Sequence, residues 1–215
     1  MLRKIIKYLV PNRGEIFFKF FIEAAYNVHH SATLLVRIIN AKTPDISKEL
    51  VSGLRQKRQQ AVDINKKIII QLNQQFITPI DRGDIFYLSG ILLKLNKRIV
   101  KINKKMQIYA IDILADDCLI RSFITLQDIT KILCDLMIAF SQKNERLIKY
   151  SNSKVNELDE NIFENLGDAL EQIKVKNYDT LTTMKIEEVF KAVEFAIDTS
   201  VTLCDSVMRI YVKEI

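Results

Sequence analysis

The sequence predicts an all-α protein, an antiparallel six-helix bundle, because turn-forming residues are scarce and apolar residues recur at helical spacing. Only 5 Gly and 3 Pro occur among 215 residues, so few turns and long elements are expected. Apolar residues make up 48% and charged residues 27% of the chain, which is typical of a soluble globular protein. We expect a single domain over residues 1–215, built from two three-helix repeats at about 13–113 and 119–213.

The first predicted helix spans about residues 13–41, and the second about residues 44–75. Between them stands Pro44, which disfavours helix at the residue before it. The first helix carries apolar residues that recur every three or four positions and so form one stripe. This stripe comprises Phe17, Phe21, Ala24, Val28, Ala32, Leu35 and Ile39.

The third predicted helix, which begins after Asp81, has the most regular pattern, from Ile85 to Ile113. Asp81 is suited to cap its start, and Asp84 falls in the first turn, where a carboxylate favours the positive end of the helix dipole. Steps of three and four alternate as in a heptad, which predicts packing along neighbouring helices. The heptad positions are Ile85, Leu88, Leu92, Leu95, Ile99, Ile102, Met106, Tyr109 and Ile113.

The second half repeats this plan with helices expected at about 119–142, 145–175 and 180–212. Thr125 and Asp128 suggest an early break in the first of these. The last helix again has one apolar stripe. The stripe comprises Ile186, Phe190, Val193, Ile197, Val201, Cys204, Met208 and Tyr211.

Charge is distributed unevenly between the two halves. Residues 1–110 hold 20 Lys and Arg against 7 Asp and Glu, whereas residues 111–215 hold 12 against 19. A basic face is expected on the outer side of the third helix, where it is either a solvated surface or a contact for anionic lipid or an acidic protein. No nucleic acid is expected, because aromatic residues do not interleave with the cations. The basic face comprises Lys94, Lys97, Arg98, Lys101 and Lys105.

No motif for catalysis or nucleotide binding is present, and we expect a protein that is not an enzyme. His29 and His30 are the only histidines, and adjacent residues on a helix point in different directions. The three cysteines lack metal-ligand spacing and are expected to be reduced and buried. No apolar run reaches the roughly 20 residues that span a bilayer, so a cytoplasmic location is expected.

The segment Phe76-Ile-Thr-Pro-Ile-Asp-Arg-Gly-Asp-Ile85 resembles a motif of the PhoU-like family associated with Pit-type phosphate permeases. Gly83 stands where Glu is usual. Residues 17–25 and 185–213 are similar to the first and last helices of that family, so the resemblance spans almost the whole chain. The motif residues that carry it are Thr78, Pro79, Asp81 and Asp84.

The resemblance implies a cytoplasmic accessory or regulatory protein for inorganic phosphate transport. A Pit-type phosphate permease is the implied partner, with contact at the inner membrane face. The resemblance leaves self-association into a homo-oligomer open. It also implies clusters of divalent or iron-type metal ions, bound by carboxylates at positions i and i+4 on facing helices, which is the donor type that hard cations prefer.

Only one of the four carboxylate pairs expected from the resemblance is intact in this chain. The matches are Gln59 and Asp63, Leu93 and Lys97, Asp159 and Phe163, and Glu194 and Asp198. Because two unit charges about 4 Å apart interact by roughly 4 kcal/mol at an effective dielectric constant near 20, Lys97 opposes a metal cluster in the first half. We expect Lys97 to pair with Asp63 instead.

On the last helix the acidic face is retained. Glu194 and Asp198 form the intact pair, and Asp205 lies two turns further along the same face. This face is either solvated or holds one divalent cation, and the second alternative would make the chain a metal-binding structural bundle.

Overall fold

The computed structural model describes residues 15–110, 117–176 and 178–214, which form six α-helices and no strand. The prediction of an all-α bundle of six helices is confirmed. The helices are α2 (Glu15–Ile39), α3 (Pro44–Gln74), α4 (Arg82–Tyr109), α5 (Asp117–Ser141), α6 (Glu145–Lys176) and α7 (Thr180–Glu214).

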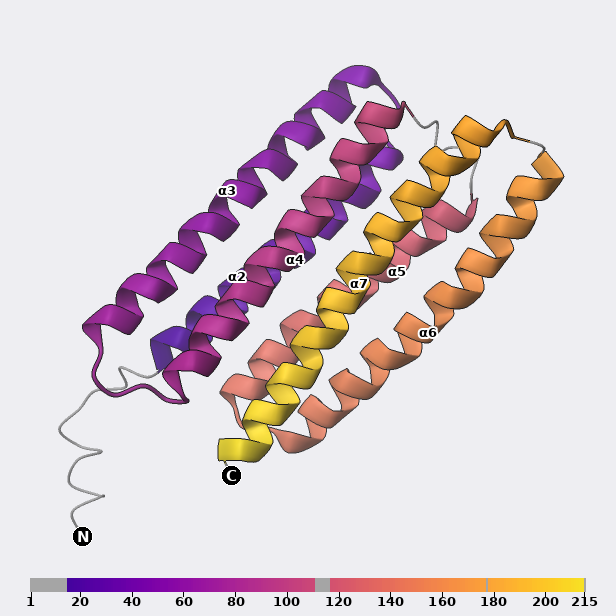
Figure 1. The fold of residues 1–215 in the computed structure, drawn as a ribbon. Helices are drawn as coiled ribbons and strands as arrows, with labels where there is room; N and C mark the ends of the chain where they lie inside the picture. Colours follow the sequence, from indigo (N-terminus) through magenta and orange to yellow (C-terminus); the bar gives the residue numbers. More distant parts are fainter. Residues whose placement is uncertain (1–14, 111–116, 177, 215) are drawn as a thin grey trace, which may run out of the picture.

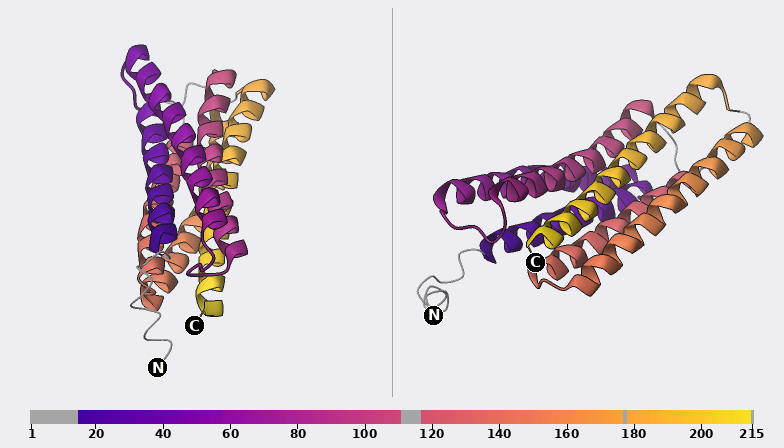
Figure 2. Two further views of the ribbon diagram at one scale, coloured as in Figure 1. Left: turned by 90° about the vertical axis from the view of Figure 1, so that its left-hand side faces the viewer. Right: turned by 60° about the horizontal axis from the view of Figure 1, so that its bottom comes forward.

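The helices lie side by side in two layers (Figure 1). Helices α3, α4, α7 and α6 follow one another across the front, and α2 and α5 lie behind them. Helices α2, α3 and α4 all contact one another, as do α5, α6 and α7. The pairs α2–α5 and α4–α7 join these two groups. Figure 2 shows from two further sides that all six helices run along a common long direction.

One hydrophobic core extends through both groups of helices, and it is built from the predicted stripes. In α4 the heptad positions from Ile85 to Met106 are buried, with Leu88, Leu95 and Ile99 fully so. The stripe of α2 is buried along its whole length. Phe123 of α5 lies in the same core cluster as Leu95. This continuity means that burial of apolar side chains holds the two groups together.

Local capping sets where the helices start and stop. Thr43 caps α3, and Asp81 caps α4 by accepting hydrogen bonds from the backbone N–H groups of Gly83 and Asp84. Ala110 ends α4 in the left-handed conformation, at φ 49°. Lys143 has φ 55° between α5 and α6, where a residue of positive φ commonly closes a helix end.

Some local expectations differ from the structure. The expected early break is absent, because helix α5 continues through Thr125 and Asp128, and the Thr125 hydroxyl donates to the Arg121 carbonyl one turn earlier. The predicted end of the third helix at residues 111–113 lies outside the described residues. Cys134 and Cys204 are free and buried, as predicted, whereas the side chain of Cys118 lies outside the described part of the structure. Burial raises the pKa of the Cys134 thiol to about 12. Among the described residues no helix is long and apolar enough to cross a membrane.

Candidate functional site

The motif residues at 78–84 build the connection between α3 and α4. The Thr78 hydroxyl donates to the Ile80 carbonyl at 2.8 Å. The Arg82 guanidinium donates to the carbonyl oxygens of Gln75 and Leu72, which lie at the end of α3. These bonds satisfy carbonyl groups that the helix end leaves without a partner. The hydrogen bonds of this motif therefore fix a tight turn.

Asp84 joins this connection to the far end of the chain. Its carboxylate forms an ion pair with the Lys213 ammonium at 3.0 Å, so the start of α4 is held beside the end of α7. One turn away, the Arg209 guanidinium lies 5.7 Å from the centroid of the Tyr87 ring. The last helix is thus tied to α4 by two cationic side chains.

The packing of α4 against α7 uses two residues of the predicted basic face and leaves the other three exposed. The Lys105 ammonium lies 2.6 Å from the Glu188 carboxylate and also donates to the Glu188 carbonyl. The hydrogen bond from Lys105 to the Glu188 carboxylate, together with the charge of Lys105, lowers the pKa of that carboxyl group. The Arg98 guanidinium lies 5.5 Å from the centroid of the Phe195 ring and donates to the Phe195 carbonyl. Both cations are therefore used within the bundle.

The remaining members of the basic face are open to solvent. Lys94, Lys97 and Lys101 are exposed on α4, and the adjacent Lys104 is exposed as well. Within the part of the chain that the structure describes, none of these four ammonium groups forms an ion pair. They supply the cations of this surface that an external partner can reach.

The predicted ion pair between Lys97 and Asp63 is wrong for the described residues. The Asp63 carboxylate accepts a hydrogen bond from the Gln59 amide at 3.1 Å, one turn away on the same helix. Asp63 also lines a pocket between α2 and α3, whereas Lys97 lies on α4. Neither side chain forms an ion pair with another described residue, and the spacing within one helix did not reveal which residues of two helices meet.

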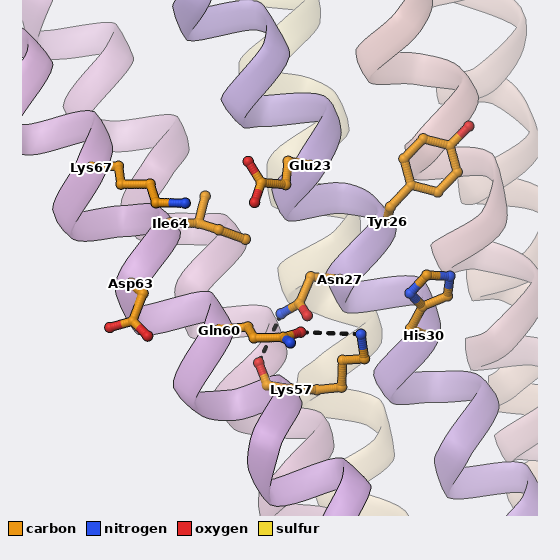
Figure 3. Close-up of a pocket in the computed structure, with 9 residues that line it drawn as sticks. All are labelled: Glu23, Tyr26, Asn27, His30, Lys57, Gln60, Asp63, Ile64 and Lys67. Atoms are coloured by element: carbon orange, nitrogen blue, oxygen red, sulfur yellow. Dashed lines mark hydrogen bonds between the residues drawn. The ribbon is translucent and has the colours of Figure 1, made fainter.

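The pocket between α2 and α3 was not predicted from the sequence (Figure 3). It encloses about 530 Å³. Asn27 donates to the Lys57 carbonyl at 2.8 Å, and Lys57 donates to the Gln60 amide oxygen at 3.1 Å. Burial and the charge of Lys57 lower the pKa of His30. The residues that line the pocket are Glu23, Tyr26, Asn27, His30, Lys57, Gln60, Asp63, Ile64 and Lys67.

The sequence carries no signal for this pocket, because the burial of the polar residue Asn27 is seen only in the structure. Asn27 is 5% exposed, and its side-chain oxygen has no hydrogen-bond partner among the described residues. Such buried acceptors are uncommon in folded proteins. The pocket holds both signs of charge, because Glu23 of α2 and Asp63 of α3 line it together with Lys57 and Lys67 of α3.

The acidic face of α7 receives a third carboxylate from α6. Burial raises the pKa of Asp159, and the nearby charges of Asp198 and Glu160 raise it further. Burial likewise raises the pKa of Glu194, followed by the charges of Asp198 and Asp159. The structure therefore brings Asp159, Glu194 and Asp198 close enough to repel one another. Asp205 lies further along α7 and is exposed.

These carboxylates do not form a preformed metal centre. Among the described residues no group of three or more His, Cys, Asp or Glu side chains is placed to hold a metal ion. In the carboxylate pairs expected from the resemblance, Phe163 stands where the partner of Asp159 would be, and its side chain lies outside the described part of the structure. A cation on Glu194, Asp198 or Asp205 stays a prediction.

The fold and these surfaces define a class of protein: a six-helix bundle with charged faces on its outer helices and pockets between them. The chain has the fold of PhoU-like proteins. It matches the crystal structure of a protein from Shewanella oneidensis MR-1, described as a PhoU-like phosphate regulatory protein, with a TM-score of 0.79 and 14% identity. The match covers 92% of this chain and 99% of that one.

A second crystal structure of a PhoU-like protein from Shewanella oneidensis MR-1 matches with a TM-score of 0.71 and 15% identity. The coverage is again 92% of this chain and 99% of the other. No protein-family model matches the chain, and no curated protein sequence matches it. The similarity to these solved structures is thus one of fold over almost the full length.

Proposed function

We propose that this chain is a non-enzymatic accessory protein that regulates inorganic phosphate transport by contact with a phosphate permease. The observation that carries this proposal is the full-length structural match to a PhoU-like phosphate regulatory protein. The motif at residues 76–85 supports it independently, because this segment resembles the PhoU-like proteins associated with Pit-type permeases. The chain would act in the cytoplasm, at the inner membrane face.

The exposed cations of α4 are the proposed contact surface. Lys94, Lys97 and Lys101 are exposed on one side of the helix. Arg98 and Lys105 hold α7 in place and are excluded from the contact, because both are already bonded within the bundle. A surface of this kind favours the acidic cytoplasmic loops of a permease and the anionic headgroups around it.

The experiment measures both association and transport in the host of this chain. We expect the chain to co-purify with the Pit-type permease of that host, and deletion of its gene to change the initial rate of radiolabelled phosphate uptake. The triple variant Lys94→Glu/Lys97→Glu/Lys101→Glu should reduce the recovered permease by about tenfold, because it reverses three charges at the rim of the contact.

The matched control is Lys19→Glu/Arg37→Glu/Lys131→Glu. It makes the same change in net charge at exposed positions of α2 and α5, which form the other layer of the bundle. This control should retain permease binding. Unchanged phosphate uptake in the deletion strain, at both low and high external phosphate, would refute the proposed function.

A further inference from the structure

A second groove lies on the surface between α3 and α4 and differs in charge from the pocket between α2 and α3. It encloses about 460 Å³. Its lining residues are Arg55, Arg58, Gln59, Val62, Val100 and Lys104. Three of the six side chains are cationic, and no carboxylate is among the described residues that line it. The pocket between α2 and α3, by contrast, balances two lysines with Glu23 and Asp63.

The three cations of the groove have no partner among the described residues. Arg55, Arg58 and Lys104 are exposed, and none of them forms an ion pair or a hydrogen bond with another described residue. Gln59 is held by its hydrogen bond to Asp63. Three like charges from two facing helices repel one another in the free protein, so an anion between them relieves this repulsion.

The apolar residues of the groove strengthen this attraction. Val100 is 3% exposed and Val62 is half-buried, so the groove is bordered by the apolar interior of the α3–α4 contact. Cations beside a low-dielectric wall attract an anion more strongly than cations on a flat solvated surface.

We propose that this groove binds a small anion that carries several phosphate groups. The planar guanidinium groups of Arg55 and Arg58 match phosphate oxygens in bidentate geometry. Both the volume and the three cations exceed what a single phosphate group requires, and a chain of two or three phosphates satisfies them together. No aromatic side chain is among the described residues that line the groove, and these residues offer no stacking surface for nucleic-acid bases.

The groove adjoins the surface proposed for permease contact but uses different residues. It shares no residue with Lys94, Lys97 and Lys101, although Lys104 lies one turn beyond Lys101 on α4. Binding of an oligophosphate can therefore be tested on the purified chain without any permease, and the two proposals can fail independently.

The experiment is calorimetric titration of the full chain with inorganic tripolyphosphate at low ionic strength. We expect saturable binding of one tripolyphosphate, and weaker binding of orthophosphate because it makes fewer contacts. The double variant Arg55→Gln/Arg58→Gln should weaken tripolyphosphate binding by at least about tenfold, since a hydrogen bond to a charged group is commonly worth one decade in affinity or more. Lys104→Gln should weaken it in the same direction.

Arg37→Gln/Lys131→Gln is the matched control, because it removes two exposed cations from α2 and α5. It should bind tripolyphosphate within about twofold of the unaltered chain, since distant exposed charges are screened. All variants are expected to unfold at the temperature of the unaltered chain. The proposal is overturned if the control loses affinity as much as the groove variant. It is also overturned if the chain binds phosphatidylglycerol vesicles but not tripolyphosphate, which would assign the cations to a lipid surface.

Discussion

Two outer faces of the bundle carry opposite charges. One is formed by α3 and α4 and the other by α6 and α7, which are the second and third helices of each half. The first presents Arg55, Arg58 and Lys104 around a groove. The second brings Asp159, Glu194 and Asp198 together. Because the scaffold depends on buried stripes, substitutions on exposed faces change stability little. One architecture can therefore carry a cationic site in one half and an anionic one in the other.

The largest expected effect tests whether the two halves share one core. Leu95→Ala in α4 and Phe123→Ala in α5 each remove a side chain that is 0% exposed. We expect losses of about 3 and about 4 kcal/mol in the free energy of unfolding, because each leaves a cavity in close-packed surroundings. Urea denaturation followed by circular dichroism measures both values.

Both substitutions should shift a single transition, since Leu95 and Phe123 belong to one core cluster. Ile108→Ala is the control, because Ile108 is 76% exposed on the same helix as Leu95. Two separate transitions, with each substitution shifting only one, would show that the halves unfold independently and that the chain is not a single domain.

An intermediate effect concerns the motif that occurs only between α3 and α4. Asp81→Ala should cost about 1 kcal/mol of unfolding free energy, because the Asp81 carboxylate caps α4. Asp81→Asn should retain most of that stability, since an amide oxygen also accepts from the first-turn N–H groups. If both variants keep full stability but lose permease binding, the motif is a contact site and not only a structural turn.

The smallest expected effect tests the repulsion on the acidic face. Asp198→Asn should raise the free energy of unfolding by up to about 0.5 kcal/mol at neutral pH, because Glu194 and Asp198 are like charges four residues apart on a helix. Asp205→Asn should have no effect, since Asp205 is exposed and away from the other carboxylates. Equal stabilisation by both variants would mean that overall charge, and not this cluster, is responsible.

The same variant has an expected pH dependence. The pKa values of Asp159 and Glu194 are raised in the folded state, so the folded chain takes up protons more readily than the unfolded one. Their ionised forms therefore oppose folding at neutral pH, and this penalty disappears as the pH falls through the raised values. The advantage of Asp198→Asn should shrink over that range. If a cation binds on this face, Mn²⁺ should raise the free energy of unfolding of the unaltered chain more than that of Asp198→Asn.

Much of the fold was predictable from the sequence because helical periodicity is a property of one helix. The predicted start of α7 at Thr180 agrees with the structure, whereas the predicted start of the first helix at residue 13 lies outside the described residues. Asp81 was predicted as the cap of α4 and accepts the two hydrogen bonds expected of a cap. These features depend on residues that are neighbours in the chain.

The charged sites were predicted less well because their partners come from other helices. Arg98 and Lys105 were grouped with exposed lysines by spacing alone, but α7 supplies Phe195 and Glu188 to them. The α2–α3 pocket was missed because Asn27 becomes unusual only when its buried, unpartnered oxygen is seen.

The sequence by itself determined that this protein is a bundle of long amphipathic helices with a basic first half and an acidic second half. Only the tertiary structure decided which charges remain available. It placed Arg55, Arg58 and Lys104 around one groove, and it paired Asp63 with Gln59 on its own helix. The rotation of each helix about its own axis depends on how all six helices bury their stripes together, and that packing sets the neighbours of every charged side chain.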